Sequence, residues 1–450
     1  MNDHAKRIPP QLPPLFDDEP QSILQEAKAT VANIQAIWDK VAREVTPENA
    51  TIENVILPIA HIENSTKLHI DVVIFLSTVH PTLEVREATK DARRFIDEAE
   101  VDLYLREDIF RLVNTLLEKT DEAETDPETY RFLLKLHAQF VRNGCDLEGQ
   151  ARDQFEQDTK RLNMLTKEYK SNLDNNKAGM WVTRSDLEGL PADFIDSLKE
   201  GDAENQGMLW VNMARPHWSR VLKFAKSEDT RRRYFIQHLN RVPENVPLHR
   251  EIILLRDSLA RQKGWKSWAY LKMSEKMMQN PETVSDVLAE MHPKLYEKGL
   301  REAEELLALK RADSPDPEVK LFFWDHSFYE NAREEKKESV DSRLTMDYFE
   351  VKTTVRNILS LYERLFDIEF ELVTAERAQQ LHGKRCTGTT WQEDVFFYIV
   401  WDKANMNPFL GYIYFDLHPR PGKYTHAGHY NLQKACSILH CFSTSSIDNT

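Results

Sequence analysis

The spacing of apolar residues predicts a chain built mainly of amphipathic helices. Apolar positions recur at steps of three and four, which places them on one face of a helix. Ser22 is expected to cap the first helix, Asp126-Pro127 to begin the second, and Asn143-Gly144 to end it in a left-handed turn. The helical stretches are 23–45, 126–141, 155–173, 281–295 and 351–366.

Strand signals are confined to the last quarter of the sequence. Residues 395–401 and 410–417 are short runs of aromatic and β-branched residues, separated by the turn-forming stretch 405–408. The chain has only 13 glycines and shows no internal repeat. We therefore expect a mainly α fold with one small sheet near the C-terminal end.

Length, composition and charge indicate a globular protein of two or three compact units. The chain has 450 residues, of which 41% are hydrophobic and 30% charged, outside the range of disordered chains. Its net charge of −15 disfavours nucleic acid and anionic membranes as partners. Residues 1–20 read as a proline-rich arm, and no apolar run reaches the ~18 residues of a membrane span.

The nucleophiles and basic residues of the chain form no known catalytic motif. Its four cysteines suggest reduced thiols in a cytosol-like compartment. Cys145 follows Asn143-Gly144 and is interpreted as a helix-end residue, with a reactive thiolate as the alternative. The basic run Arg231–Arg233 is interpreted as a solvated or domain-bridging helix face.

A search for metal ligands finds no zinc-binding helix. None of the 15 histidines is followed by glutamate, and no two are four residues apart, which excludes the His-Glu-x-x-His motif and its inverted form. One group of soft and borderline donors could surround zinc, but its irregular spacing matches no finger or ribbon. The alternative is that its members line a strand, a turn and a polar tail. They are His426, His429, Cys436, His440 and Cys441.

One segment resembles the signature of a known enzyme family. Gly411-Tyr-Ile-Tyr-Phe-Asp-Leu-His-Pro-Arg-Pro-Gly-Lys-Tyr-Thr-His-Ala427 is similar to a stretch of the zinc metallopeptidases thimet oligopeptidase, neurolysin and saccharolysin. His418 departs from it, since these relatives more often have tyrosine there. Further similar stretches run in the family's order: Thr46–Asn54, Pro58–Asn64, Tyr104–Asp108, Trp324-Asp325 with Tyr329, and Leu361–Phe366.

The resemblance implies an elongated, mostly helical peptidase fold with a deep channel between two walls. In this chain the first wall would comprise 21–155, the second 156–347, and 348–436 would return to the first wall and begin the sheet of the catalytic cleft. Residues 437–450 no longer resemble the family and are interpreted as a divergent tail, so that the fold would be incomplete.

The resemblance also implies the chemistry. Family members hydrolyse short peptides with a zinc-bound water held by a His-Glu-x-x-His helix. That helix is expected beyond residue 450, so we expect no catalytic residue, no metal ligand and no bound zinc in this chain, and no hydrolysis by it. Tyr424 and His426 are expected at the edge of the substrate cleft. We also expect a monomer in the cytoplasm, the compartment that the cysteines suggest, with an organellar intermembrane location as the alternative. The competing hypothesis is a non-catalytic helical peptide-binding or regulatory protein derived from a peptidase.

Overall fold

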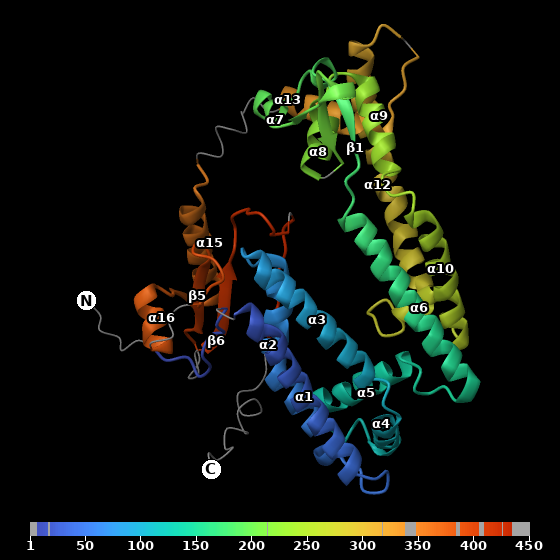
Figure 1. Ribbon diagram of the computed structural model, residues 1–450, viewed down its shortest axis with the longest axis vertical. Coiled ribbons are helices and arrows are strands. Elements are labelled where there is room, and N and C mark those ends of the chain that lie inside the picture. Colours follow the sequence, from blue (N-terminus) through green and yellow to red (C-terminus); the bar gives the residue numbers. More distant parts are fainter. Residues whose placement is uncertain are drawn as a thin grey trace. The chain divides into compact units, whose positions relative to one another are not determined.

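The computed structural model describes residues 7–16, 19–213, 215–316, 318–337, 348–383, 388–404, 409–424 and 426–433. The chain divides into two compact units (Figure 1). Unit 1 contains Met1–Glu148 and Phe349–Thr450, and unit 2 contains Gly149–Tyr348. Helices dominate the described chain and its sheets are small and antiparallel, which confirms the predicted mainly α class. No helix in these ranges is both long and apolar enough to cross a bilayer.

The first part of unit 1 is a helical bundle. Three long helices pack against one another, and two shorter ones cover their ends (Figure 1). Trp38 and Phe140 are fully buried in its core, and the Trp38 ring lies edge-on to Tyr104 with 5.7 Å between centroids. The elements are α1 (Pro20–Glu44), the π-helical turn η1 (Ile52–Ile56), α2 (Leu57–Val79), α3 (Leu83–Leu103), α4 (Glu107–Lys119) and α5 (Pro127–Arg142).

The ends of these helices follow local chemistry, with one correction. Asp126 caps α5 by accepting a hydrogen bond from the Thr129 amide, and Gly144 takes a φ of 88° after the helix, as predicted. Ser22 does not cap α1. The helix begins at Pro20, whose fixed φ and missing amide hydrogen suit a first helical position, and the Ser22 hydroxyl donates to the Glu19 carbonyl inside the first turn.

The second part of unit 1 holds a three-stranded antiparallel sheet. The strand order is β4-β5-β6, and the two strands predicted from the sequence are its centre and one edge. Phe397, Ile399 and Trp401 of β5 alternate toward the core. The third strand, β4, was not anticipated. The elements are α15 (Val351–Phe366), β4 (Ile368–Leu372), α16 (Ala375–His382), β5 (Phe396–Asp402) and β6 (Phe409–Phe415).

Unit 2 contains a second small sheet, so the expectation of strands only in the last quarter is wrong. Its order is β1-β3-β2, and Met180, Val182, Leu209 and Val211 turn their side chains into the core beneath it. The strands are β1 (Gly179–Thr183), β2 (Lys199–Glu200) and β3 (Met208–Asn212), with the short helices η2 (Ser185–Leu187), α7 (Ala192–Asp196) and η3 (Ala203–Asn205) between them.

Long helices form the remainder of unit 2, and α6 runs beside α10 (Figure 1). The helix predicted at 281–295 is the first part of α12, but its apolar stripe is not buried: Leu288 and Leu295 are 59% and 57% exposed. The helices are α6 (Gly149–Asp174), α8 (Arg215–Phe224), α9 (Glu228–Leu239), α10 (Asn245–Gln262), α11 (Trp268–Met273), α12 (Pro281–Asp313) and α13 (Phe323–Lys337).

Candidate functional site

The segment that carries the family signature turns back after β6 around one carboxylate, Asp416. The Asp416 side chain is 8% exposed. It accepts hydrogen bonds from Arg420 at 2.7 and 2.8 Å, from Lys423 at 2.8 Å and from the Trp391 indole at 2.9 Å. Arg420 also donates to the carbonyl of Val79 at the end of α2. The turn is therefore fixed to both the sheet and the helical bundle of unit 1.

The surroundings of Asp416 keep it ionised. Burial alone would raise the pKa of the carboxyl group, but hydrogen bonds from Arg420, Lys423 and Trp391 outweigh that effect and lower the pKa to about 2. Lys423 donates further to the carbonyls of Asp416 and His418. The two cations and the carboxylate thus form an internal structural cluster, with no free group left for acid–base chemistry at neutral pH.

Tyr424 and His426, the residues expected at the cleft edge, lie side by side after this turn. Their ring centroids are 4.9 Å apart, and the Tyr430 ring lies 5.4 Å from that of Tyr424. Burial, with Tyr430 and Asp416 nearby, raises the pKa of Tyr424. A side chain at Gly428 would stand 3.0 Å from the Tyr430 ring, so glycine allows this close packing. His426 is exposed, with its Nδ1 2.8 Å from the Ala427 carbonyl oxygen.

Within the described ranges, no three His, Cys, Asp or Glu side chains come together in a way that could hold a metal ion. His426 and His429 of the sequence-level donor group are both exposed. The other three members, Cys436, His440 and Cys441, lie outside the described residues. Cys145 is buried, and its thiol donates to the Tyr104 carbonyl at 3.3 Å, which agrees with the interpretation of Cys145 as a structural helix-end residue.

Two other family-like stretches meet in space. Tyr104, at the end of α3, donates a hydrogen bond to Glu63 of α2 at 3.2 Å. Burial and the carboxylates of Glu63 and Glu100 raise the pKa of Tyr104. These residues border a cavity of about 430 Å³ within the helical bundle of unit 1. Glu63 and Tyr104 are 41 positions apart, and the sequence gave no sign that their two stretches would meet.

A buried ion cluster in unit 2 was missed by the sequence interpretation. Arg231 is 1% exposed and donates to Asp325 at 2.8 Å, and Lys310 donates to the other oxygen of Asp325 at 2.6 Å. The prediction of a solvated or bridging face is therefore wrong for Arg231. The side chains of Arg232 and Arg233 are 48% and 39% exposed and do face solvent. Three successive helical residues point about 100° apart, so one of them falls on the buried face.

Comparisons with known proteins agree with the family resemblance. Residues 221–449 match the family model described as peptidase family M3. The chain is 36% identical to oligopeptidase PhomG' of Diaporthe leptostromiformis over 89% of its own length and 33% of that protein. It is 34% identical to oligopeptidase PhomG of the same organism over 90% and 54%, and 28% identical to saccharolysin of Saccharomyces cerevisiae over 96% and 60%.

The chain thus spans between 33% and 60% of the length of these three relatives. The similarity to them covers both units, and the family model alone matches about half of the chain and includes the signature strand β6 and its turn. With signature, helical fold and sequence similarity in agreement, this chain belongs to peptidase family M3.

Proposed function

We propose that this chain is part of a metallo-oligopeptidase that acts on short peptides. The observation that carries the proposal is that relatives named oligopeptidase match 89% and 90% of the chain. Zinc is the metal that the family resemblance implies, and it would supply an activated water for attack on the peptide bond. The protein would act in the cytoplasm, where the thiols of its four cysteines stay reduced.

The residues that the structure describes do not form a zinc site. The sequence contains no His-Glu-x-x-His, and the described ranges hold no cluster of three donor side chains. We therefore assign peptide binding, and not bond cleavage, to the described residues. The same observation favours the second candidate, a non-catalytic peptide-binding protein derived from a peptidase. The two candidate functions are distinguished by whether longer products of the same gene encode a His-Glu-x-x-His helix.

Tyr424 and His426 are the proposed peptide contacts. The Asp416 cluster fixes the turn that precedes them, and the Tyr430 ring packs against the Tyr424 ring. His426 is exposed, and its imidazole can donate or accept a hydrogen bond. An exposed imidazole held against a tyrosine ring offers a peptide one polar and one apolar contact, and neither of them requires a metal.

The test uses a quenched fluorescent nonapeptide, blocked at both ends, added to the 450-residue protein with and without zinc. We expect saturable binding without cleavage, and weaker binding by His426→Ala. His429→Ala is the matched control, because His429 is an exposed histidine of the same segment outside the Tyr424 ring pair. If the peptide does not bind, the proposal is wrong. If the protein cleaves the peptide when zinc is added, the assignment of binding without cleavage is wrong.

A further inference from the structure

Residues 7–16, the described part of the proline-rich arm, are fastened to the sheet of unit 1 at both ends. At one end the Arg7 guanidinium pairs with Glu369 of β4 and lies over the Trp401 ring, 4.5 Å from its centroid. At the other end Phe16 is 4% exposed and belongs to a buried apolar cluster. The four prolines of the arm have no amide hydrogen, so side chains rather than a strand ladder hold it.

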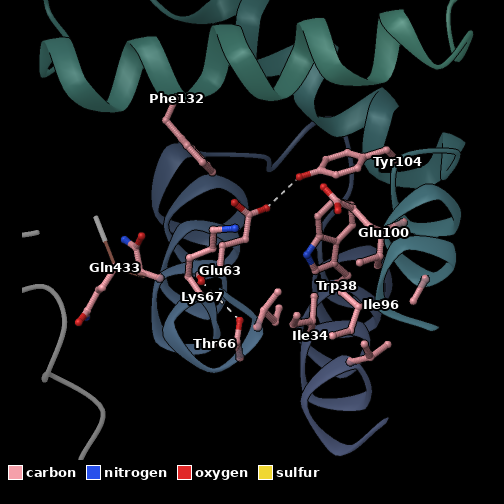
Figure 2. A pocket seen from close by; sticks show the side chains of 15 residues that line it. Ile34, Trp38, Glu63, Thr66, Lys67, Ile96, Glu100, Tyr104, Phe132 and Gln433 are labelled. Atoms are coloured by element: carbon pink, nitrogen blue, oxygen red, sulfur yellow. Dashed lines mark hydrogen bonds between the residues drawn. The ribbon is translucent and has the colours of Figure 1, made fainter. Parts of the chain in front are cut away.

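The middle of the arm contacts the chain just after the family signature. The Tyr412 hydroxyl of β6 donates to the Gln11 carbonyl oxygen, and the Gln11 side-chain amide donates to the Gln433 side-chain oxygen at 2.8 Å. Gln433 also borders the cavity of the helical bundle (Figure 2). Gln11 therefore connects the arm both to strand β6 and to the segment that follows Tyr424 and His426.

A series of ring contacts leads from Phe16 to the proposed peptide contacts. The Phe16 ring meets Trp391 edge-on with 5.0 Å between centroids, and Trp391 meets Phe75 of α2 edge-on at 4.8 Å. Phe75 contacts Tyr430 at 5.2 Å, and Tyr430 contacts Tyr424 at 5.4 Å. Tyr424 also packs directly against the buried cluster that contains Phe16. Phe16 thus belongs to the surface that holds the Tyr424 ring.

The contacts of the arm allow it to exchange between a docked and a released state. Ile8 and Leu12 are 81% and 51% exposed, and the ion pair of Arg7 with Glu369 is partly exposed on both sides. Exposed ion pairs contribute little to stability, and segments with few buried contacts open before the rest of a fold. Release of the arm would withdraw the Phe16 ring from the cluster that supports the peptide contacts.

We propose that residues 7–16 act as a strap that positions Tyr424 and His426, so that peptides bind more tightly when the strap is docked. Gln11 and Phe16 are the positioning residues, because they contact the chain around the site and not the peptide. The assignment rests on the proposed function for the identity of the peptide contacts. It adds a linkage: if the docked strap favours peptide binding, a bound peptide must favour docking by the same factor.

The first measurement uses this linkage in the unchanged 450-residue protein. Trypsin cleaves after Arg7 when the strap is released, so the rate at which the amino-terminal fragment appears in mass spectrometry reports the released population. A saturating concentration of a blocked nonapeptide without lysine or arginine should slow this cleavage ~5-fold or more, the lower end of typical coupling between sites. Gln11→Ala, which removes one hydrogen bond of the strap, should speed the cleavage ~3- to 10-fold.

The second measurement is the affinity for the same nonapeptide. Phe16→Leu keeps an apolar side chain but loses the ring contacts of the strap, so it should speed cleavage after Arg7 ~5-fold or more and weaken peptide binding. Phe140→Leu is the matched control, because Phe140 is a fully buried ring in the helical bundle of the same unit, outside the cluster of Phe16. It should lower the stability of unit 1 and leave the affinity unchanged.

A bound nonapeptide that leaves the cleavage rate unchanged would overturn the strap, as would an equal loss of affinity in Phe16→Leu and Phe140→Leu. Thermal unfolding establishes that each variant is folded, and the linkage measurement needs no variant. If the nonapeptide binds and His426→Ala weakens it, but the strap has no effect, the strap is wrong and the proposed function stands. If the nonapeptide does not bind the unchanged protein, both proposals are wrong.

Discussion

Replacement of Asp325 by asparagine tests the buried ion cluster of unit 2. The Asp325 side chain has no exposed surface, and it accepts hydrogen bonds from Arg231, Lys310 and the Phe322 amide. Asparagine has nearly the same shape and retains an oxygen for the Phe322 amide. Its NH₂ group, however, would face a cationic donor, and the negative charge between two buried cations would be lost.

The expected loss of stability is large. Hydrogen bonds to charged groups contribute ~1.5–3 kcal/mol each, and removing one partner of a buried ion pair costs ~3–5 kcal/mol. Glu228 still accepts from Lys310 at 2.9 Å and offsets part of the loss. We therefore expect the unfolding free energy of unit 2 to fall by about 4 kcal/mol, against a typical total of ~5–15 kcal/mol for a domain.

Urea titration followed by tryptophan fluorescence measures this loss, because Trp324 lies next to Asp325 and reports on unit 2. The control is Asp229→Asn, which removes an exposed carboxylate from α9 and should change stability little. Lys310→Met completes a double-mutant cycle, and a coupling of about 2 kcal/mol with Asp325→Asn is expected. A loss below about 1 kcal/mol for Asp325→Asn, or additive single effects, would refute the reasoning.

Three further predictions follow from the fold. Asp416→Asn should lower the unfolding free energy by about 2 kcal/mol at pH 7, because the pKa of about 2 lies below the unfolded value of ~3.9. The difference in stability between the variant and the unchanged protein should persist above about pH 4 and disappear as the pH falls through about 2. A difference that does not depend on pH in urea titrations would contradict this reasoning. Ile358 and Leu365 of α15 are 48% and 63% exposed, so the native protein should bind the dye anilinonaphthalene sulfonate and increase its fluorescence. The double variant Ile358→Gln with Leu365→Gln should reduce the fluorescence of the bound dye, and unchanged fluorescence would count against this prediction. The buried Cys145 thiol should react with a maleimide only on unfolding, as followed by mass spectrometry of its peptide, whereas rapid labelling of the native protein would restore the thiolate alternative.

Helix positions were predictable from the sequence because they depend on neighbouring residues. Asp126 and Gly144 define the ends of α5 through contacts within a few residues. The sheet of unit 2 was missed because its longer strands have five residues each, too few for alternation to be distinct from a buried helical turn. Pairing of Trp181 with Trp210 makes them strands, and pairing is not visible in a linear pattern.

The sites were less predictable, since they depend on contacts between distant residues. Lys310 follows Leu306 by one helical turn, and both are buried on the same face of α12, but a lysine at such a position normally indicates solvent. The positions of Asp325 and Glu228, both bonded to Lys310, explain it. The family resemblance pointed to Tyr424 and His426, and it included the stretches that contain Glu63 and Tyr104. It gave no reason to expect that the last two would meet at a cavity.

The division of unit 1 into two separated stretches has a consequence for the order in which the protein is made. Phe16 and Phe75 of the first stretch complete their core with Trp391 and Val395 of the second, and Arg420 reaches Val79 across 341 residues. All of unit 2 is synthesised between them. Since domains form as their residues leave the ribosome, unit 2 should fold while the face of α2 that carries Phe75 still lacks Trp391 and Val395. The face of α2 that packs on Trp391 is therefore the part of this core that stays exposed longest during synthesis.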